Sequence, residues 1–204
     1  VIAGMCAGAD SIDNLDVVRS GGMKTLFDGV YAPSTIGTLL REFTFGHTRQ
    51  LDGVLRGHLV ALCGRVDLLP GAQERAFIDI DSLLRPVYGH AKQGACYGHT
   101  KIAGKQVLRK GLSPLVTTIS TDHSAPVIAG ARLRAGKANS GKGAASMITE
   151  AVATARAAGV TGQILVRGDS AYGTGTVVNA AREAGARFSV VLNKTTTVAA
   201  VIAS

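Results

Sequence analysis

The chain has 204 residues, 46% of them hydrophobic, which is enough for one packed domain and a smaller region and argues against disorder. Its 22 lysines and arginines outnumber its 14 acids, and the net charge of +8 indicates a polyanionic partner, most commonly nucleic acid. Three widely spaced cysteines indicate neither a disulfide framework nor a zinc ribbon, and no apolar run approaches the roughly 18 residues of a membrane span.

Residues 1–75 are predicted to form a helical N-terminal region that could contact DNA. In "APSTIGTLLREF", Pro33 precedes a serine and a threonine, which is a helix-start signal, and apolar residues then recur at helical spacing. The segment "QLDGVLRGHLVALCG" repeats this helical pattern. Pro70 and Gly71 break the helix, so a domain boundary is expected close to residue 75.

Residues 76–204 are predicted to form an α/β domain. The alternating segment "FIDIDSLL" predicts a strand, "HTKIAGKQVL" and "LSPLVTTIST" predict two more, and "APVIAGARLRAG" is expected to be a bulged extension. Then follow a helix in "GKGAASMITEAVATARAAG", a strand in "QILVRGD", a helix in "GTVVNAAREAG" and a strand in "ARFSVVLN". Three strands followed by alternation predict a mixed sheet flanked by helices.

Two acids fall at equivalent places on two of these strands. Asp169 ends "QILVRGD" and Asp81 lies near the end of "FIDID", 88 positions earlier. Ligands of open α/β sheets gather beyond the carboxyl ends of strands, and Mg²⁺ prefers carboxylate oxygens. Asp79 shares a strand face with Asp81 and is a competing or supporting metal ligand. The alternative is that each aspartate simply forms a turn.

The segment "GKANSGKG" at residues 136–143 contains most of a phosphate-binding P-loop pattern. Its last position is Gly143, where the pattern requires a serine or threonine for Mg²⁺, and the preceding stretch is too charged for a buried central strand. A nucleotide-binding loop therefore remains an alternative. A basic loop that contacts DNA phosphates through Lys137 and Lys142 is the favoured interpretation.

Three long segments, "APSTIGTLLREFTFGHTRQLD", "FIDIDSLLRPVYGHAKQGACYGHTK" and "ILVRGDSAYGTGTVVNAAREAGARFSVV", resemble bacterial insertion-sequence transposases of the DDE class, specifically the insertion-sequence-1380 type. The resemblance implies a ribonuclease-H-like fold, three acids and two Mg²⁺ or Mn²⁺ ions. The motif "DIDS" implies that Asp81 is the first acid and "RGDSAY" that Asp169 is the second, on adjacent strands.

The third acid of that family is a glutamate on a helix after the fifth strand. The fifth strand here is "ARFSVVLN", and Glu183 precedes it, so Glu183 does not fill the role. The chain begins at Val1 rather than at a methionine and stops within an apparent helix, so it is expected to be truncated at both ends. Its catalytic domain would then be incomplete at the C-terminus, with two of the three acids.

The implied function is that of a transposase fragment, with metal-dependent hydrolysis of a phosphodiester at the ends of an insertion element, followed by strand transfer. A nuclease of the same fold and an inactive DNA-binding remnant remain as alternatives. The expected partner is double-stranded DNA, as element ends and target, with a homodimer as a further expectation and the nucleoid of the bacterial cytoplasm as the location. The residues expected to bind DNA are Lys92, Lys101, Lys105, Arg109, Lys110, Lys137 and Lys142.

Overall fold

A computed structural model describes residues 1–90, 92–192 and 195–203. The chain divides into two compact units, residues 1–50 and 51–204. The boundary falls inside the helix α3 (Phe45–Cys63), which starts in the first unit and continues into the second. The helices before the first strand thus extend beyond the first compact unit.

The first unit is helical, as the sequence predicts. It contains α1 (Ile2–Cys6), the 3₁₀ helices η1 (Asp13–Arg19) and η2 (Gly21–Thr25), and α2 (Pro33–Arg41). Pro33 occupies the first turn of α2, where its missing N–H costs no hydrogen bond. Leu15, Val18 and Ile36 are the buried large apolar residues of this unit.

The second unit is built on a main sheet of five strands in the order β6-β5-β1-β7-β8. The strands are β1 (Arg75–Ser82), β5 (Leu115–Ser120), β6 (Val127–Arg132), β7 (Gln163–Gly168) and β8 (Arg187–Val190). Strands β6, β5 and β1 pair antiparallel, whereas β1, β7 and β8 pair parallel. The predicted ribonuclease-H-like mixed sheet flanked by helices is confirmed.

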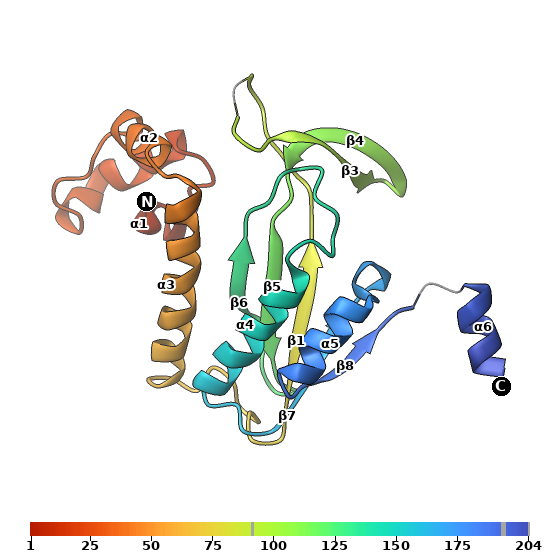
Figure 1. Ribbon diagram of the computed structural model, residues 1–204. Helices are drawn as coiled ribbons and strands as arrows, with labels where there is room; N and C mark the ends of the chain where they lie inside the picture. Colours follow the sequence, from red (N-terminus) through yellow and green to blue (C-terminus); the bar gives the residue numbers. More distant parts are fainter. Residues whose placement is uncertain (91, 193–194, 204) are drawn as a thin grey trace. The chain divides into compact units, whose positions relative to one another are not determined.

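Helices α4 (Ala144–Ala157) and α5 (Gly175–Glu183) lie side by side across one face of the main sheet (Figure 1). Side chains alternate across a strand, so Ile78 and Ile80 of β1 point into the core that these helices cover. Asp79 and Asp81 lie on the opposite face of β1. The acids inside an apolar run are thus explained by a strand that is buried on one side.

A second sheet of three strands is inserted between β1 and β5, in the order β2-β4-β3. This inserted sheet consists of β2 (Arg85–Pro86), β3 (Cys96–Ile102) and β4 (Lys105–Leu112). The single strand expected in "HTKIAGKQVL" is wrong, because Ala103 and Gly104 both have positive φ and make a two-residue hairpin turn. The third strand of the main sheet is instead β6, which pairs with β5 through an irregular register at Thr117 and Thr118.

The remaining elements are η3 (Ser170–Tyr172) and α6 (Thr196–Ala203). None of the helices in the described part of the chain combines the length and apolar character needed to cross a bilayer.

Candidate active site

The sheet register brings Asp81 and Asp169 together. In the parallel pairing of β1 with β7, Asp79 lies opposite Arg167. The same register continued by two residues places Asp81 opposite Asp169, which follows directly after β7. Neighbouring strands are about 4.8 Å apart, so the two backbones are adjacent at this point. Asp81 and Asp169, the acid pair, also line the same cavity of about 470 Å³.

Each carboxylate of the acid pair has one oxygen held by a backbone amide. Asp81 Oδ1 accepts a hydrogen bond from the N–H of Ser82 at 2.7 Å, and Asp169 Oδ1 accepts one from the N–H of Ala171 at 2.9 Å. Both side chains are exposed, and neither forms an ion pair with a residue that the structure describes. The backbone therefore orients two negative charges, while Arg167, which lines the same cavity, pairs with Asp79 instead.

The acid pair fits a hard divalent cation. Mg²⁺ is usually held by one or two carboxylates, and water and substrate phosphates complete its shell. Over residues 1–90, 92–192 and 195–203, no three His, Cys, Asp or Glu side chains converge as a metal site. The described residues thus offer two oxygen ligands at the strand ends without a third acidic partner.

Asp79 differs from the acid pair because Arg167 occupies both of its oxygens. The guanidinium donates from Nε to Oδ1 and from Nη2 to Oδ2, each at 2.7 Å. It also lies over the Phe77 ring, 4.2 Å from the ring centre. The hydrogen bond to Asp79 raises the pKa of Arg167 above its ordinary value, while partial burial opposes this shift. This pairing favours a structural role for Asp79 over the metal-ligand role.

Tyr172 lies buried behind the acid pair, with 1% of its surface exposed. Its hydroxyl makes no hydrogen bond of acceptable geometry with any described residue, although Ser82 lies near enough to interact with it. Burial raises the pKa of Tyr172, Asp81 and Asp169 raise it further, and Ser82 and Arg134 oppose the rise. Tyr172 therefore stays neutral beneath the two carboxylates at neutral pH.

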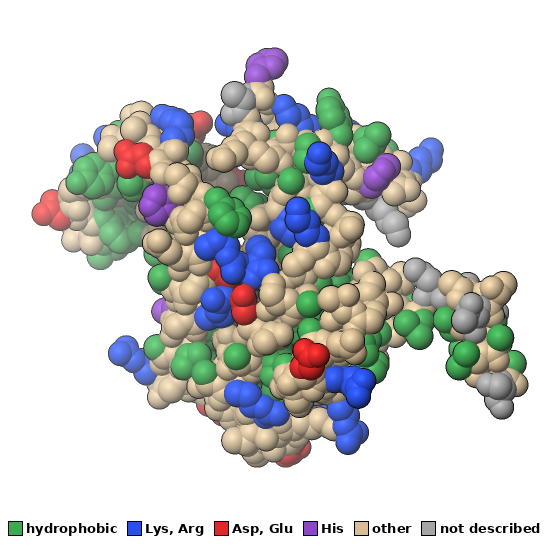
Figure 2. Space-filling model, viewed as in Figure 1, with side chains coloured by type: hydrophobic (Ala, Val, Ile, Leu, Met, Phe, Trp, Pro, Cys, Tyr) green, Lys and Arg blue, Asp and Glu red, His purple; other side chains and the backbone are tan. Residues whose placement is uncertain are grey.

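Positive charge is concentrated in residues 82–149, which form most of the chain segment that connects the two acids. Residues 82–149 contain ten of the 22 lysines and arginines but one acid, Asp122. The inserted sheet contains no acid, and lysine and arginine side chains are visible over it in Figure 2. A strongly basic surface without acids is the electrostatic feature expected of a site that contacts DNA phosphates.

The residues predicted to bind DNA all lie in this basic segment. Lys92, Lys105 and Arg109 are exposed on the inserted sheet or its connections, and Lys110 Nζ donates to the backbone oxygens of Gly89 and His90 at 3.4 and 3.2 Å. Lys101 belongs to β3, but its side chain lies outside the described residues. Lys137 and Lys142 are exposed on the loop that leads to α4.

Arg134 organises that loop, and sequence reasoning missed it. Its side chain is buried, and Nη1 donates to the backbone oxygens of Asn139, Ser140 and Lys142 at 3.0, 3.0 and 2.9 Å. Nε and Nη2 bind the backbone oxygen and the hydroxyl of Ser113 at 3.0 and 3.1 Å. We call residues 134–143 the anchored loop. The one signal in the sequence was a pair of arginines, Arg132 and Arg134, before a glycine-rich turn.

The geometry of the anchored loop does not support the nucleotide-binding P-loop interpretation. A phosphate-binding loop presents free backbone N–H groups to its ligand. Here the N–H of Lys142 donates to the side chain of Asn139 at 2.9 Å, and the N–H of Ala144 donates to Gly141 O at 3.1 Å. Three carbonyl groups of the loop point to Arg134. The N–H groups of Lys142 and Ala144 are thus committed to contacts within the loop.

The mixed sheet, the acid pair and the basic insertion are compatible with a DDE-type domain, the class that the sequence resembles. A family model described as transposase DDE domain group 1 matches residues 34–204, which is most of the chain. The chain belongs to this family.

Two further comparisons add little. No curated protein sequence matches the chain. A crystal structure of the Mos1 strand transfer complex is similar at 10% sequence identity and a TM-score of 0.29. The match covers 95% of this chain and 56% of that chain, so this chain spans little more than half the length of that structure.

Proposed function

We propose that the chain is part of a bacterial DNA transposase of the insertion-sequence-1380 type, and that Asp81 and Asp169 hold its divalent cation. The observation that carries the proposal is the cavity that both acids line, where the register of β1 and β7, continued by two residues, places them opposite each other. Membership of the DDE family supports it. The cation is Mg²⁺ or Mn²⁺, two ions in a complete site, because both take carboxylate oxygens.

The residues of this chain would orient the reacting groups. The N–H groups of Ser82 and Ala171 each hold one oxygen of the acid pair. The second oxygen of each carboxylate is then available for the cation, which would neutralise charge that develops on a reacting phosphodiester. The lysines and arginines of the inserted sheet and the anchored loop would bind phosphates of the element ends and of the target. Hydrolysis followed by strand transfer needs only this positioning and charge neutralisation.

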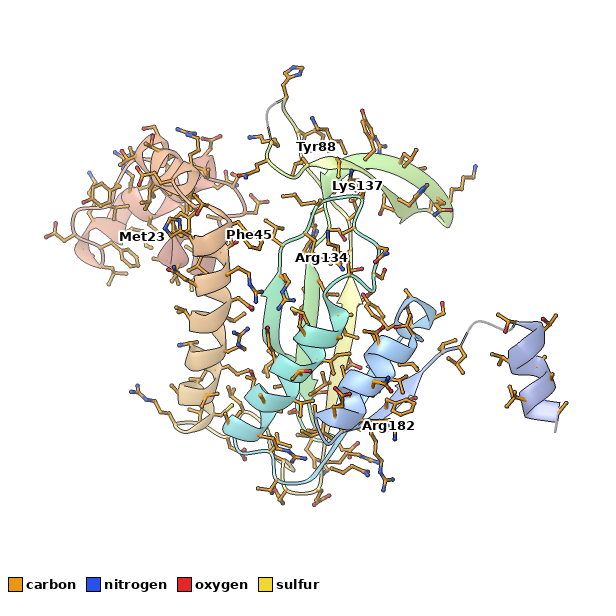
Figure 3. The ribbon with its side chains drawn as sticks, in the orientation of Figure 1. Met23, Phe45, Tyr88, Arg134, Lys137 and Arg182 are labelled. Atoms are coloured by element: carbon orange, nitrogen blue, oxygen red, sulfur yellow. The ribbon has the colours of Figure 1, made fainter. Side chains whose placement is uncertain are left out.

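No third acid is assigned among the residues that the structure describes. Glu183 is the last residue of α5, a helix of nine residues that begins after Asp169. Such a helix is about 13 Å long. Figure 3 shows its neighbour Arg182 at the end of α5 that lies far from Lys137. Glu183 is therefore badly placed to join the acid pair. A homodimer in the bacterial cytoplasm, acting at the nucleoid, completes the proposal.

Divalent-ion binding tests the acid pair without requiring turnover. Mn²⁺ titration by calorimetry or electron paramagnetic resonance should show binding that Asp81→Asn and Asp169→Asn each weaken by at least about tenfold, as expected when a site loses a charged ligand. Asp122→Asn is the matched control, because Asp122 pairs with Arg75 outside the cavity of the acid pair. Equal Mn²⁺ affinity in all four proteins would refute the proposed metal site.

A strand-transfer assay separates the alternatives. A transposase joins a labelled element end to a target plasmid, a nuclease of the same fold cuts without joining, and an inactive remnant binds DNA without cutting it. Joining that Asp81→Asn abolishes is the expected result.

A further inference from the structure

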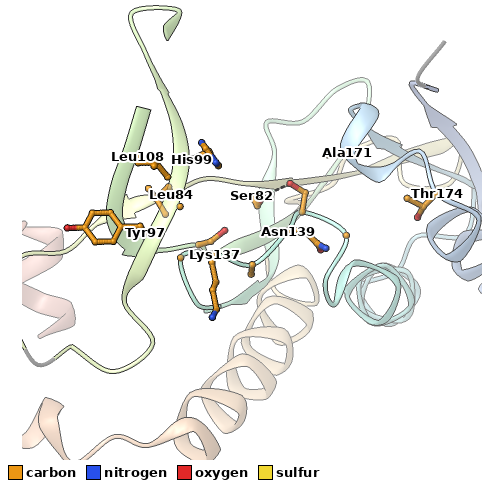
Figure 4. A pocket seen from close by; sticks show the side chains of 15 residues that line it. Ser82, Leu84, Tyr97, His99, Leu108, Lys137, Asn139, Ala171 and Thr174 are labelled. Atoms are coloured by element: carbon orange, nitrogen blue, oxygen red, sulfur yellow. Dashed lines mark hydrogen bonds between the residues drawn. The ribbon is translucent and has the colours of Figure 1, made fainter. Parts of the chain in front are cut away.

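A second cavity of about 790 Å³ lies beside the acid pair and is shown in Figure 4. Its walls come from the end of β1, the inserted sheet, the anchored loop and the segment after Asp169. We call it the hydroxyl cleft, because its polar lining consists mainly of hydroxyl and amide groups and no described acid lines it. The polar residues that define it are Ser82, His99, Ser113, Lys137, Asn139, Ser140 and Thr174.

The hydroxyl cleft and the acid pair share their walls. Ser82 lines the cleft, follows Asp81 directly and donates its N–H to the Asp81 carboxylate. Ala171 lines the cleft on the other side and donates its N–H to the Asp169 carboxylate. A ligand in the cleft would therefore contact residues that are one or two positions away in the sequence from each acid.

Buried contacts fix the loop side of the cleft. Arg134 holds three carbonyl groups of the anchored loop, and the hydroxyl of Ser82 bonds that of Ser140 at 3.3 Å. The buried guanidinium also places a positive charge beneath the loop. The side chains of Asn139 and Ser140 thus line the cleft from a backbone that is already ordered, so binding costs little conformational entropy.

Close backbone packing fixes the opposite wall. A Cβ atom on Gly98 would lie 2.1 Å from Gly136 O, so glycine permits β3 to rest directly on the anchored loop. The amide of Lys137 also donates to the sulfur of Cys96 at 3.1 Å. The His99 ring, Leu84 and Leu108 then line this side. This side of the cleft thus combines a flat imidazole ring with two leucine side chains, whereas the loop side is polar.

This combination matches the chemistry of a nucleotide strand. Hydroxyl, amide and ammonium groups donate to phosphate oxygens, and an imidazole ring with apolar neighbours provides a surface for a base. The volume lies within the 300–1,000 Å³ typical of small-ligand sites, which suits about one or two nucleotides rather than a duplex. The acid-free lining also distinguishes this cleft from the cavity of the acid pair.

We propose that the hydroxyl cleft binds an unpaired stretch of the DNA strand next to the bond that the acid pair would cut. The proposal rests on the proposed function for the identity of the polyanion. In this arrangement, the exposed lysines of the inserted sheet bind double-stranded DNA, and the cleft binds the unpaired strand. DNA would thus have to open locally on one side of the reacting phosphate.

Fluorescence anisotropy in EDTA tests the cleft independently of the metal. The probe is a short labelled single strand, compared with the same sequence as a blunt duplex. Lys137→Gln should weaken single-strand binding roughly tenfold and reduce the slope of log K against log salt by about 0.7, as expected for the loss of one phosphate contact. Arg182→Gln removes an exposed charge from the far end of α5 and should leave both quantities unchanged.

Photo-crosslinking of a thiothymidine single strand locates the bound DNA. Crosslinks within residues 82–84, 97–99 or 136–141 are the expected result. Crosslinks confined to other residues, unchanged binding in Lys137→Gln, or equal competition by ATP would overturn the proposal. If the acid pair binds Mn²⁺ but the crosslinks lie outside the cleft, the cleft proposal fails and the proposed function stands. If the crosslinks lie in the cleft but Mn²⁺ does not bind, only the proposed metal site fails.

Discussion

The main sheet and the inserted sheet are stabilised in different ways. The main sheet buries alternate residues of β1, β5 and β7 against α4 and α5. The inserted sheet exposes half of the residues of β4 and carries five lysines and arginines without an acid, so it has little apolar surface to bury. It is attached instead by glycine backbone contacts and by the arginine that anchors the adjoining loop. A scaffold for two acids and a strongly basic surface need different kinds of support.

The largest expected effect is on the main sheet. Ile78 is fully buried in the centre of β1, so Ile78→Ala should lower the free energy of unfolding by about 2–5 kcal/mol through lost burial and the cavity left behind. Leu108→Ala, in the inserted sheet, is the matched control, because Leu108 is 57% exposed and should change stability by less than about 0.5 kcal/mol. Urea unfolding followed by circular dichroism measures both. Similar losses in the two variants would contradict the comparison.

An intermediate effect is expected where the inserted sheet meets the anchored loop. Gly98→Ala forces a Cβ atom against the backbone oxygen of Gly136, and such overpacking costs typically about 1–3 kcal/mol. Hydrogen exchange should accelerate in β3 and β4 and remain unchanged in β1 and β7, because the main sheet keeps its own core.

Gly57→Ala is the control for this substitution. Gly57 lies in α3 with open space around its Cα, so alanine there should stabilise the helix by up to about 1 kcal/mol. Uniform acceleration of exchange across both sheets in Gly98→Ala would show that the inserted sheet is not a separate cooperative unit.

The smallest effect concerns Tyr172, which is buried in the core beside the main sheet. Burial raises the pKa of Tyr172 above its unfolded value of about 10, so its contribution to stability is complete below pH 10 and is lost as the pH rises through the folded pKa. Tyr172→Phe keeps the ring and removes a hydroxyl without a described hydrogen bond, so stability at pH 8 should change by at most about 1 kcal/mol.

Urea unfolding at pH 8 and above pH 10 measures this dependence. Tyr172→Phe should lose less stability at the higher pH than the unsubstituted chain. An identical loss in both proteins would show that ionisation of Tyr172 is not coupled to folding.

The sequence by itself determined the mixed sheet, the helical N-terminal region and the two strand-end acids. The alternation of "FIDID" directs one face of β1 into the core. The two acids are 88 residues apart in the sequence, which is also the separation of every residue pair between β1 and β7. These features follow from the period of apolar residues along a strand and from the positions of strand ends, and both can be read directly from the sequence.

Only the tertiary structure decided which acid is paired and what the basic segment builds. Arg167 reaches Asp79 because two strands 88 residues apart in the chain are neighbours, and this separates Asp79 from Asp81 despite their identical residue type. Arg134 and Gly98 act through backbone groups that are distant in sequence, and backbone groups carry no residue-specific pattern. The hairpin at Ala103 and Gly104 was missed because a non-glycine residue there adopts positive φ, which local propensity disfavours.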